Sequence, residues 1–227
     1  MAVISYLDTI LVPLSFFLAV GYHAYLWRII RTKPSTTAIG ADALKRKSWF
    51  LALDAGDDKK GMLAVQSLRN TLMVTILTAT ISVLVYMALA ALINNSFTAS
   101  SLFSSPFFGS ASPKIVALKY GSASLFLASS FLCSSMAVGF LVDANYLINT
   151  PSPGGGSRHH SRAVFERGFV MAILGNRLLC LTVPALMWTF GPVPAALSSG
   201  ALVWVLYELD FVGRTGGFAG KRSLDGS

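Results

Sequence analysis

The chain is 227 residues long, 54% hydrophobic and only 12% charged, with a mean hydropathy of +0.62. Soluble proteins carry about 25% charged residues, and one core could not bury so much apolar surface. This composition excludes an ordinary soluble domain and indicates that lipid is the solvent. The net charge of +8 would suggest nucleic acid in a soluble protein. Here the basic residues lie mainly between apolar segments, where they set membrane topology and attract anionic lipid headgroups, so we expect no nucleic-acid partner.

Five stretches match the roughly 20 apolar residues that cross about 30 Å of hydrocarbon. They are residues 9–27, 71–93, 121–148, 168–190 and 195–212. The last two are separated only by Gly-Pro-Val-Pro (191–194), which predicts an antiparallel hairpin or, as an alternative, a re-entrant pair. We therefore predict an all-α integral membrane helical bundle of five transmembrane helices in a single transmembrane domain.

The distribution of basic residues predicts the orientation of these spans. Fifteen Lys and Arg lie in residues 28–69, 149–167 and 213–227, whereas the alternate segments carry only Lys114 and Lys119. The positive-inside rule then places the N-terminus outside and the C-terminus in the cytoplasm. The cytoplasmic pieces are a loop at 31–70, a linker at 149–167 and a tail at 213–227. The first span is expected to stay as an anchor, in the plasma membrane or an endomembrane, because no targeting signal precedes it.

Two of the connecting segments have a distinct composition. KRKSWFLAL (45–53) places basic residues beside two aromatics, which is typical of a short helix at headgroup level. It is either an ordinary juxtamembrane segment or a specific lipid or partner site. PSPGGGSRHHS (151–161) has the composition of a mobile linker. Its adjacent histidines would point in different directions on a helix, so no metal site is predicted.

The third span is rich in small residues. They are Gly121, Ser122, Ser124, Ala128, Ser129, Ser130, Ser134, Ser135 and Gly139. Small side chains let helix backbones approach closely in lipid, so this helix is expected at the centre of the bundle or at an oligomer interface. A polar path lined by hydroxyl groups is the alternative.

Short motifs recur along nearly the whole chain in a recognisable order. They are YLDTILVPL (6–14), YHAYLW (22–27), DKKGMLAVQSLRN (58–70), ALKY (117–120), LINTPSP (147–153), GNRL (175–178), FGPV (190–193) and LYELDFV (206–212). This order resembles a plant membrane-protein family with bacterial relatives, labelled only as domain of unknown function 599. The resemblance implies a multi-spanning membrane protein and no established activity. Arg177 lies inside one of these motifs, whereas Asp143 lies outside them.

Ionisable residues inside the spans are functional candidates because burying them unpaired in lipid costs free energy. Arg177 lies about 13 Å past Gly168 and Asp143 about 6–9 Å from the inner boundary, at 1.5 Å per residue. We therefore expect Asp143 to pair with Arg177, with Asn145 and Glu208 as the next choices. Asn176 is expected to form an interhelical hydrogen bond. The inner boundary adds one further candidate group, which consists of Arg69 and Asp210 as a pair with Gln66 and Asn70 nearby.

Three functional hypotheses follow from this polar cluster. The residues either link helices in a fixed way or line a cavity, open to the cytoplasm, for an ion, a proton or a small anion. An intramembrane enzyme is the weakest hypothesis, because the sequence has no GxSxG, HExxH or glycine-rich phosphate loop; no cofactor is predicted. The leading prediction is a non-enzymatic assembly or accessory protein, working as a homo-oligomer or with a membrane-protein partner. The alternative is a small oligomeric channel or transporter.

Overall fold

A computed structural model of the chain describes residues 2–53, 58–98, 113–149 and 155–211. Within these residues every regular element is a helix. The α-helices are α1 (Ala2–Thr32), α2 (Ala38–Leu53), α3 (Asp58–Thr98), α4 (Pro113–Asn149), α5 (Gly155–Met187) and α6 (Pro192–Asp210), with short 3-10 helices η1 (Pro34–Thr36) and η3 (Trp188–Phe190). All of the α-helices except α2 are long and apolar enough to cross a membrane. The predicted all-α fold with five spans is confirmed.

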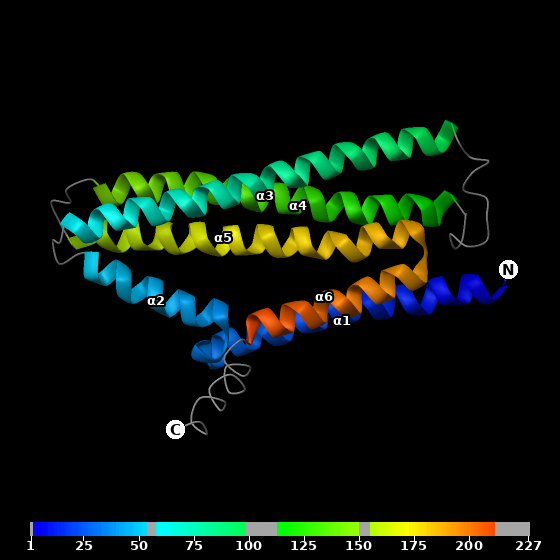
Figure 1. The fold of residues 1–227 in the computed structure, drawn as a ribbon, viewed down its shortest axis with the longest axis horizontal. Coiled ribbons are helices and arrows are strands. Elements are labelled where there is room, and N and C mark those ends of the chain that lie inside the picture. Colours follow the sequence, from blue (N-terminus) through cyan, green and yellow to red (C-terminus); the bar gives the residue numbers. More distant parts are fainter. Residues whose placement is uncertain (1, 54–57, 99–112, 150–154, 212–227) are drawn as a thin grey trace, which may run out of the picture.

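The spans alternate in direction and form two groups (Figure 1). Helices α3, α4 and α5 run side by side, while α1 and α6 form a parallel pair next to α5. α6 folds back along α5 after a turn at Gly191, whose φ of 135° lies in a region that favours glycine. The predicted hairpin of the last two spans is therefore present. We call the end with this turn the turn end, and the opposite end the α2 end.

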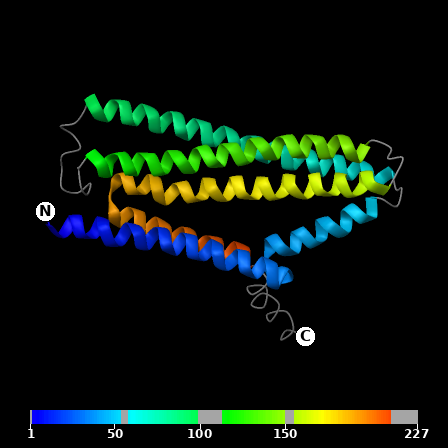
Figure 2. The ribbon, with the colours of Figure 1, turned by 180° about the vertical axis from the view of Figure 1, so that it is seen from behind.

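The three central helices are longer than a membrane is thick. α3, α4 and α5 contain 41, 37 and 33 residues, or about 50–60 Å at 1.5 Å per residue, against about 30 Å of hydrocarbon. At the α2 end they run past the ends of α1 and α6, and α2 crosses from the end of α1 to meet them (Figure 2). We call α2 and these projecting ends the helical extension.

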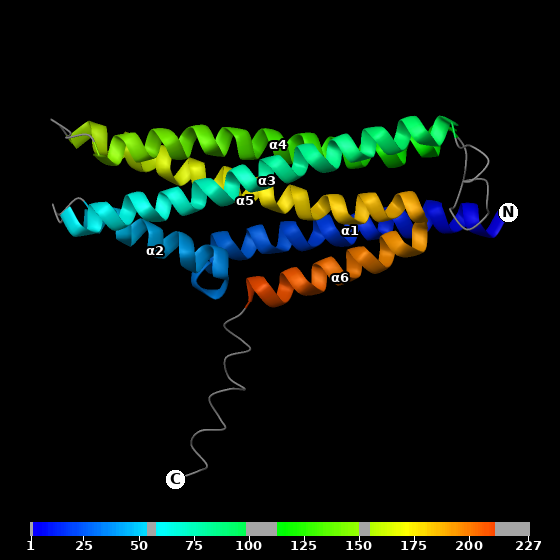
Figure 3. The ribbon, with the colours of Figure 1, turned by 45° about the horizontal axis from the view of Figure 1, so that its top comes forward.

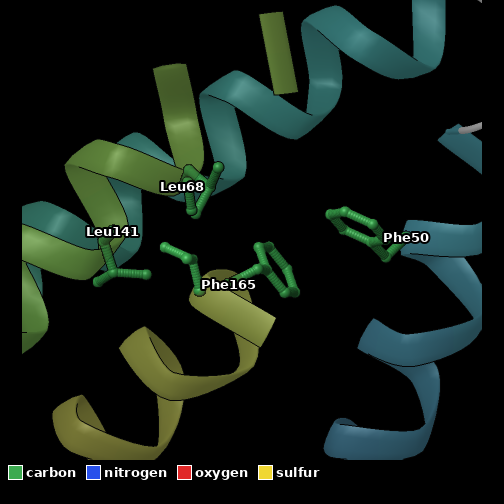
Figure 4. Packing of buried hydrophobic residues seen from close by; sticks show 6 residues of the cluster. Phe50, Leu68, Leu141 and Phe165 are labelled. Atoms are coloured by element: carbon green, nitrogen blue, oxygen red, sulfur yellow. The ribbon is translucent and has the colours of Figure 1, made fainter. Parts of the chain in front are cut away.

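The extension has its own hydrophobic core, which explains one departure from the sequence prediction. Phe50 of α2, Leu68 of α3, Leu141 of α4 and Phe165 of α5 converge there (Figure 4). The Phe165 ring lies 5.3 Å from that of Phe50, centroid to centroid. Because this packing stabilises the start of α5, residues 155–167 are helical instead of forming the predicted linker. Residues 150–154 and the predicted tail at 213–227 lie outside the described part of the chain.

α4 carries the predicted small residues, but the helix that joins the two groups of spans is α5, which contacts α3, α4 and α6. α4 packs against both α3 and α5, and in Figure 3 it runs along the upper edge of the bundle, above these two helices. Ser130 donates a hydrogen bond to the Gly175 carbonyl at 2.7 Å, and its Oγ lies 3.0 Å from Ser82 Oγ. A Cβ atom on Gly175 would overlap Ser134 Oγ and lie 3.1 Å from the Ser134 backbone nitrogen. The small side chains thus bring the α4 and α5 backbones close together.

The outward faces of the spans are apolar. Phe17 of α1, Leu84 of α3 and Leu197 of α6 are 75%, 62% and 70% exposed. So much exposed hydrophobic surface would be an aggregation liability in water, whereas hydrocarbon solvates it. The fold is that of an integral membrane protein whose spans contact lipid.

Candidate functional site

The intramembrane arginine is held by an ion pair between α5 and α6. Arg177 Nη2 donates a hydrogen bond to Asp210 Oδ1. The two side chains are 15% and 2% exposed. A buried charge of either sign would be costly alone, and each side chain here supplies the counter-charge of the other.

A third helix joins the same carboxylate. Tyr22 of α1 donates its hydroxyl hydrogen to Asp210 Oδ2 at 2.5 Å. Its ring packs with Leu26 and Leu206, so the phenol emerges from an apolar α1–α6 interface. Both oxygens of Asp210 therefore have a donor, and one side chain connects α1, α5 and α6. We call this arrangement the Tyr22–Asp210–Arg177 link.

The α5–α6 turn explains why Arg177 reaches Asp210. Asp210 lies as many residues after Gly191 as position 172 of α5 lies before it, so these two positions are at the same height. Position 172 is roughly 7 Å from Arg177 toward the α2 end, at 1.5 Å per residue. Helical side chains lean toward the N-terminus of their own helix, and the N-terminus of α5 is at the α2 end. The long arginine side chain leans in that direction and covers the distance, as a snorkelling arginine does.

The predicted Arg177–Asp143 pair is wrong. Gly168 of α5 packs against Leu141 of α4, and Gly175 against Ser134. In this antiparallel register Asp143 is level with about position 166, roughly 16 Å along the axis from Arg177. Asp143 is also exposed. The prediction failed because it placed the edges of two apolar stretches in one plane, whereas α4 and α5 both continue beyond the bilayer.

The other candidates of the predicted cluster do not gather around Arg177. Asn176 and Glu208 are exposed, and Asn145 is half-buried. On α3, the exposed side chains are Gln66, Arg69 and Asn70. The expected Arg69–Asp210 pair is wrong as well, because Asp210 is bound by Arg177 and Tyr22. The structure therefore brings together two of the predicted residues and adds Tyr22.

Sequence reasoning missed Tyr22 although it begins the motif YHAYLW (22–27). The usable signal was a phenol in the half of the first span nearest the basic loop, the same half as Asp210. A tyrosine in a span has one polar atom that needs a partner in lipid. The sequence prediction considered charged and amide side chains and overlooked the phenol.

Three buried side-chain atoms have no hydrogen-bond partner among the described residues. They are His23 Nε2, Ser134 Oγ and Arg177 Nη1. The arginine atom is an N–H donor directly beside the link, and a guanidinium donor can bind an anion. Within the described ranges, no group of three or more His, Cys, Asp or Glu could hold a metal ion.

A family model described as a protein of unknown function, DUF599, matches residues 10–215. The chain belongs to the DUF599 family. The resemblance seen in the motifs is thereby confirmed, and the match contains all three residues of the link. No curated protein and no solved structure matches significantly.

The description of the DUF599 family names no molecular activity. The fold and the family together show an integral membrane protein with a domain of unknown function. The candidate site of this DUF599 protein is a charged link between spans.

Proposed function

We propose that this protein is a non-enzymatic assembly or accessory protein of the membrane. It works as a homo-oligomer or with another membrane protein, in the plasma membrane or an endomembrane. The observation that supports this proposal is the Tyr22–Asp210–Arg177 link. Both oxygens of Asp210 accept hydrogen bonds from other spans, as expected for a structural link between helices.

Other polar groups inside the spans also join helices. Ser199 of α6 donates a hydrogen bond to the Ser15 carbonyl of α1 at 2.8 Å, and Ser130 connects α4 to both α3 and α5. Hydrogen bonds between helices supply specificity in lipid, where apolar packing alone discriminates weakly. This pattern favours a rigid scaffold.

The helical extension gives such a scaffold a surface outside the bilayer. By the positive-inside rule the α2 end faces the cytoplasm, so the extension would present α2 to cytoplasmic partners. Among the basic side chains of α2, Lys45 and Arg46 would attract anionic lipids of the same leaflet.

The alternative function is a small channel or transporter for an ion or small anion. One observation favours it: Arg177 Nη1 is a buried donor without a described acceptor. An anion passing along α5 would find a cationic hydrogen-bond donor at that point.

Reconstitution separates the two functions. The wild-type protein and the Arg177→Met and Arg177→Met/Asp210→Asn variants are purified in detergent, sized by light scattering and placed in liposomes for chloride, potassium and proton flux. The double variant removes both charges and is the folded control. We expect a discrete oligomer, or a membrane partner retained on extraction from native membranes, and no flux above empty liposomes.

Two results would overturn the assembly function. One is selective flux by the wild type that is lost in the folded double variant, which would establish the channel. The other is a wild-type protein that is strictly monomeric and retains no partner after cross-linking in native membranes.

A further inference from the structure

A cavity of about 440 Å³ lies in the helical extension, away from the link. Helices α2, α3 and α5 line it, and it is open on one side. Its lining consists of Asp42, Lys45, Arg46 and Trp49 from α2, Ser67, Leu68 and Thr71 from α3, and Phe165 and Phe169 from α5. The wall formed by α2 is therefore cationic, α3 contributes two hydroxyl groups, and the wall formed by α5 is aromatic.

The cationic wall is positioned by packing. The Arg46 guanidinium lies 4.6 Å from the centroid of the Phe169 ring, so a cation–π contact fixes it at the cavity. Burial lowers the pKa of Arg46, and Asp42 on the same helix opposes that shift. The guanidinium still stays charged at neutral pH. Asp42 Oδ1 also lies 3.9 Å from Lys45 Nζ, and both of these side chains are exposed. The lining carries two cations and one carboxylate, which leaves a net positive charge.

The cavity lies at the level where lipid headgroups are expected. Thr71 and Phe169 stand at the start of the apolar stretches 71–93 and 168–190. Independently, α6 ends at Asp210, which is level with about position 172 of α5, roughly one turn from Phe169. Trp49 also lines the cavity, and tryptophan is enriched at membrane interfaces.

We propose that this cavity binds the phosphate group of an anionic phospholipid from the adjoining leaflet. Lys45 and Arg46 neutralise the phosphate, and the Ser67 side chain offers its hydroxyl group to a phosphate oxygen. The Thr71 hydroxyl donates to the Ser67 carbonyl at 3.1 Å, and the aromatic wall covers the apolar part of the lipid. This proposal depends on the proposed function in one respect only, which is that the adjoining leaflet is the cytoplasmic one. Binding is measured on the purified protein, so a failure here leaves the assembly experiment unaffected.

Native mass spectrometry of the full-length protein in neutral detergent tests the site. The lipid probes are dioleoyl phosphatidic acid and, as a zwitterionic control, dioleoyl phosphatidylcholine. Glycerol 3-phosphate and inorganic phosphate test a soluble source of the same chemistry. We expect one phosphatidic acid retained per chain, with binding about tenfold weaker in Arg46→Gln and Lys45→Gln, since each variant removes a charged contact to phosphate.

Lys47→Gln is the matched control. Lys47 is exposed on the same helix and does not line the cavity, so this variant removes an identical charge and should bind normally. Ser67→Leu provides a second test that alters no charge, because Ser67 is exposed and leucine there would fill the cavity from α3. It should block binding even if an Arg46 variant fails to fold.

Several outcomes would overturn the proposal. Equal weakening by Lys45→Gln and Lys47→Gln would mean general attraction to a basic surface. Retention of phosphatidylcholine as strongly as phosphatidic acid would exclude phosphate-selective binding. Competition by glycerol 3-phosphate at the same concentration as the lipid would assign the site to a soluble phosphate ester. Unchanged binding in Ser67→Leu would place the lipid elsewhere.

Discussion

The Asp210 side chain is almost completely buried, and its two oxygens accept hydrogen bonds from donors on different helices. An ionised carboxylate buried between helices requires such partners, because an uncompensated buried charge costs several kcal/mol. Arg177 supplies the counter-charge and Tyr22 the second hydrogen bond. At the scale of single residues, three side chains thus determine how α1 and α6 are placed against α5.

Tyr22→Phe tests the hydrogen bond that the uncharged Tyr22 side chain donates to Asp210. The variant removes the donor to Asp210 Oδ2 but keeps the ring that packs with Leu26 and Leu206. We expect the free energy of unfolding to fall by about 1–2 kcal/mol, measured as a lower melting temperature by scanning fluorimetry in detergent. Tyr25→Phe is the control, because Tyr25 is 52% exposed on the same helix. Equal melting temperatures for the two variants would contradict a hydrogen bond to Asp210.

Between elements, the α4–α5 contact depends on the absence of a side chain at Gly175. Gly175→Ala would push against Ser134 and the Ser130 carbonyl, 3.3 Å away. Overpacking of this kind costs about 1–3 kcal/mol, which we expect as reduced resistance to unfolding by sodium dodecyl sulfate.

Gly139→Ala is the matched control on the partner helix. A Cβ at Gly139 meets nothing within 4 Å, and alanine is the better helix former by about 0.5–1 kcal/mol. That variant should be neutral or slightly more resistant. If both alanine variants behave alike, α4 and α5 are not in close contact at Gly175.

The elements also show which parts of the fold a sequence can predict. The five spans and the last hairpin follow from apolar length and from Gly-Pro-Val-Pro (191–194), which are local properties. The α4–α5 register does not follow from local properties, because it is determined by the packing of Gly168 against Leu141 and of Gly175 against Ser134. Without this register Arg177 was assigned the wrong partner. The helical start of α5 was missed for a similar reason, since its glycine-rich composition is outweighed by the burial of Phe165.

At the scale of the whole molecule, three long helices carry the extension past the ends of α1 and α6. The orientation proposed for it predicts a labelling pattern. In a background of Cys133→Ala and Cys180→Ala, Ser48→Cys on α2 should react with an impermeant maleimide only after bacterial spheroplasts are lysed. Asn95→Cys, near the opposite end of α3, should react in intact spheroplasts; both positions are exposed. The reverse labelling pattern would mean that the α2 end faces the outside, opposite to the proposed orientation.

The charged pair between α5 and α6 is the feature on which the assembly function depends. A double-mutant cycle on thermal unfolding with Arg177→Met, Asp210→Asn and the double variant measures its coupling directly. Each single variant leaves one buried charge without its partner and should lose about 3–5 kcal/mol. The double variant removes both charges and should lose less than the sum, with a coupling energy of at least about 1 kcal/mol. Small and strictly additive losses would contradict a structural link between Arg177 and Asp210.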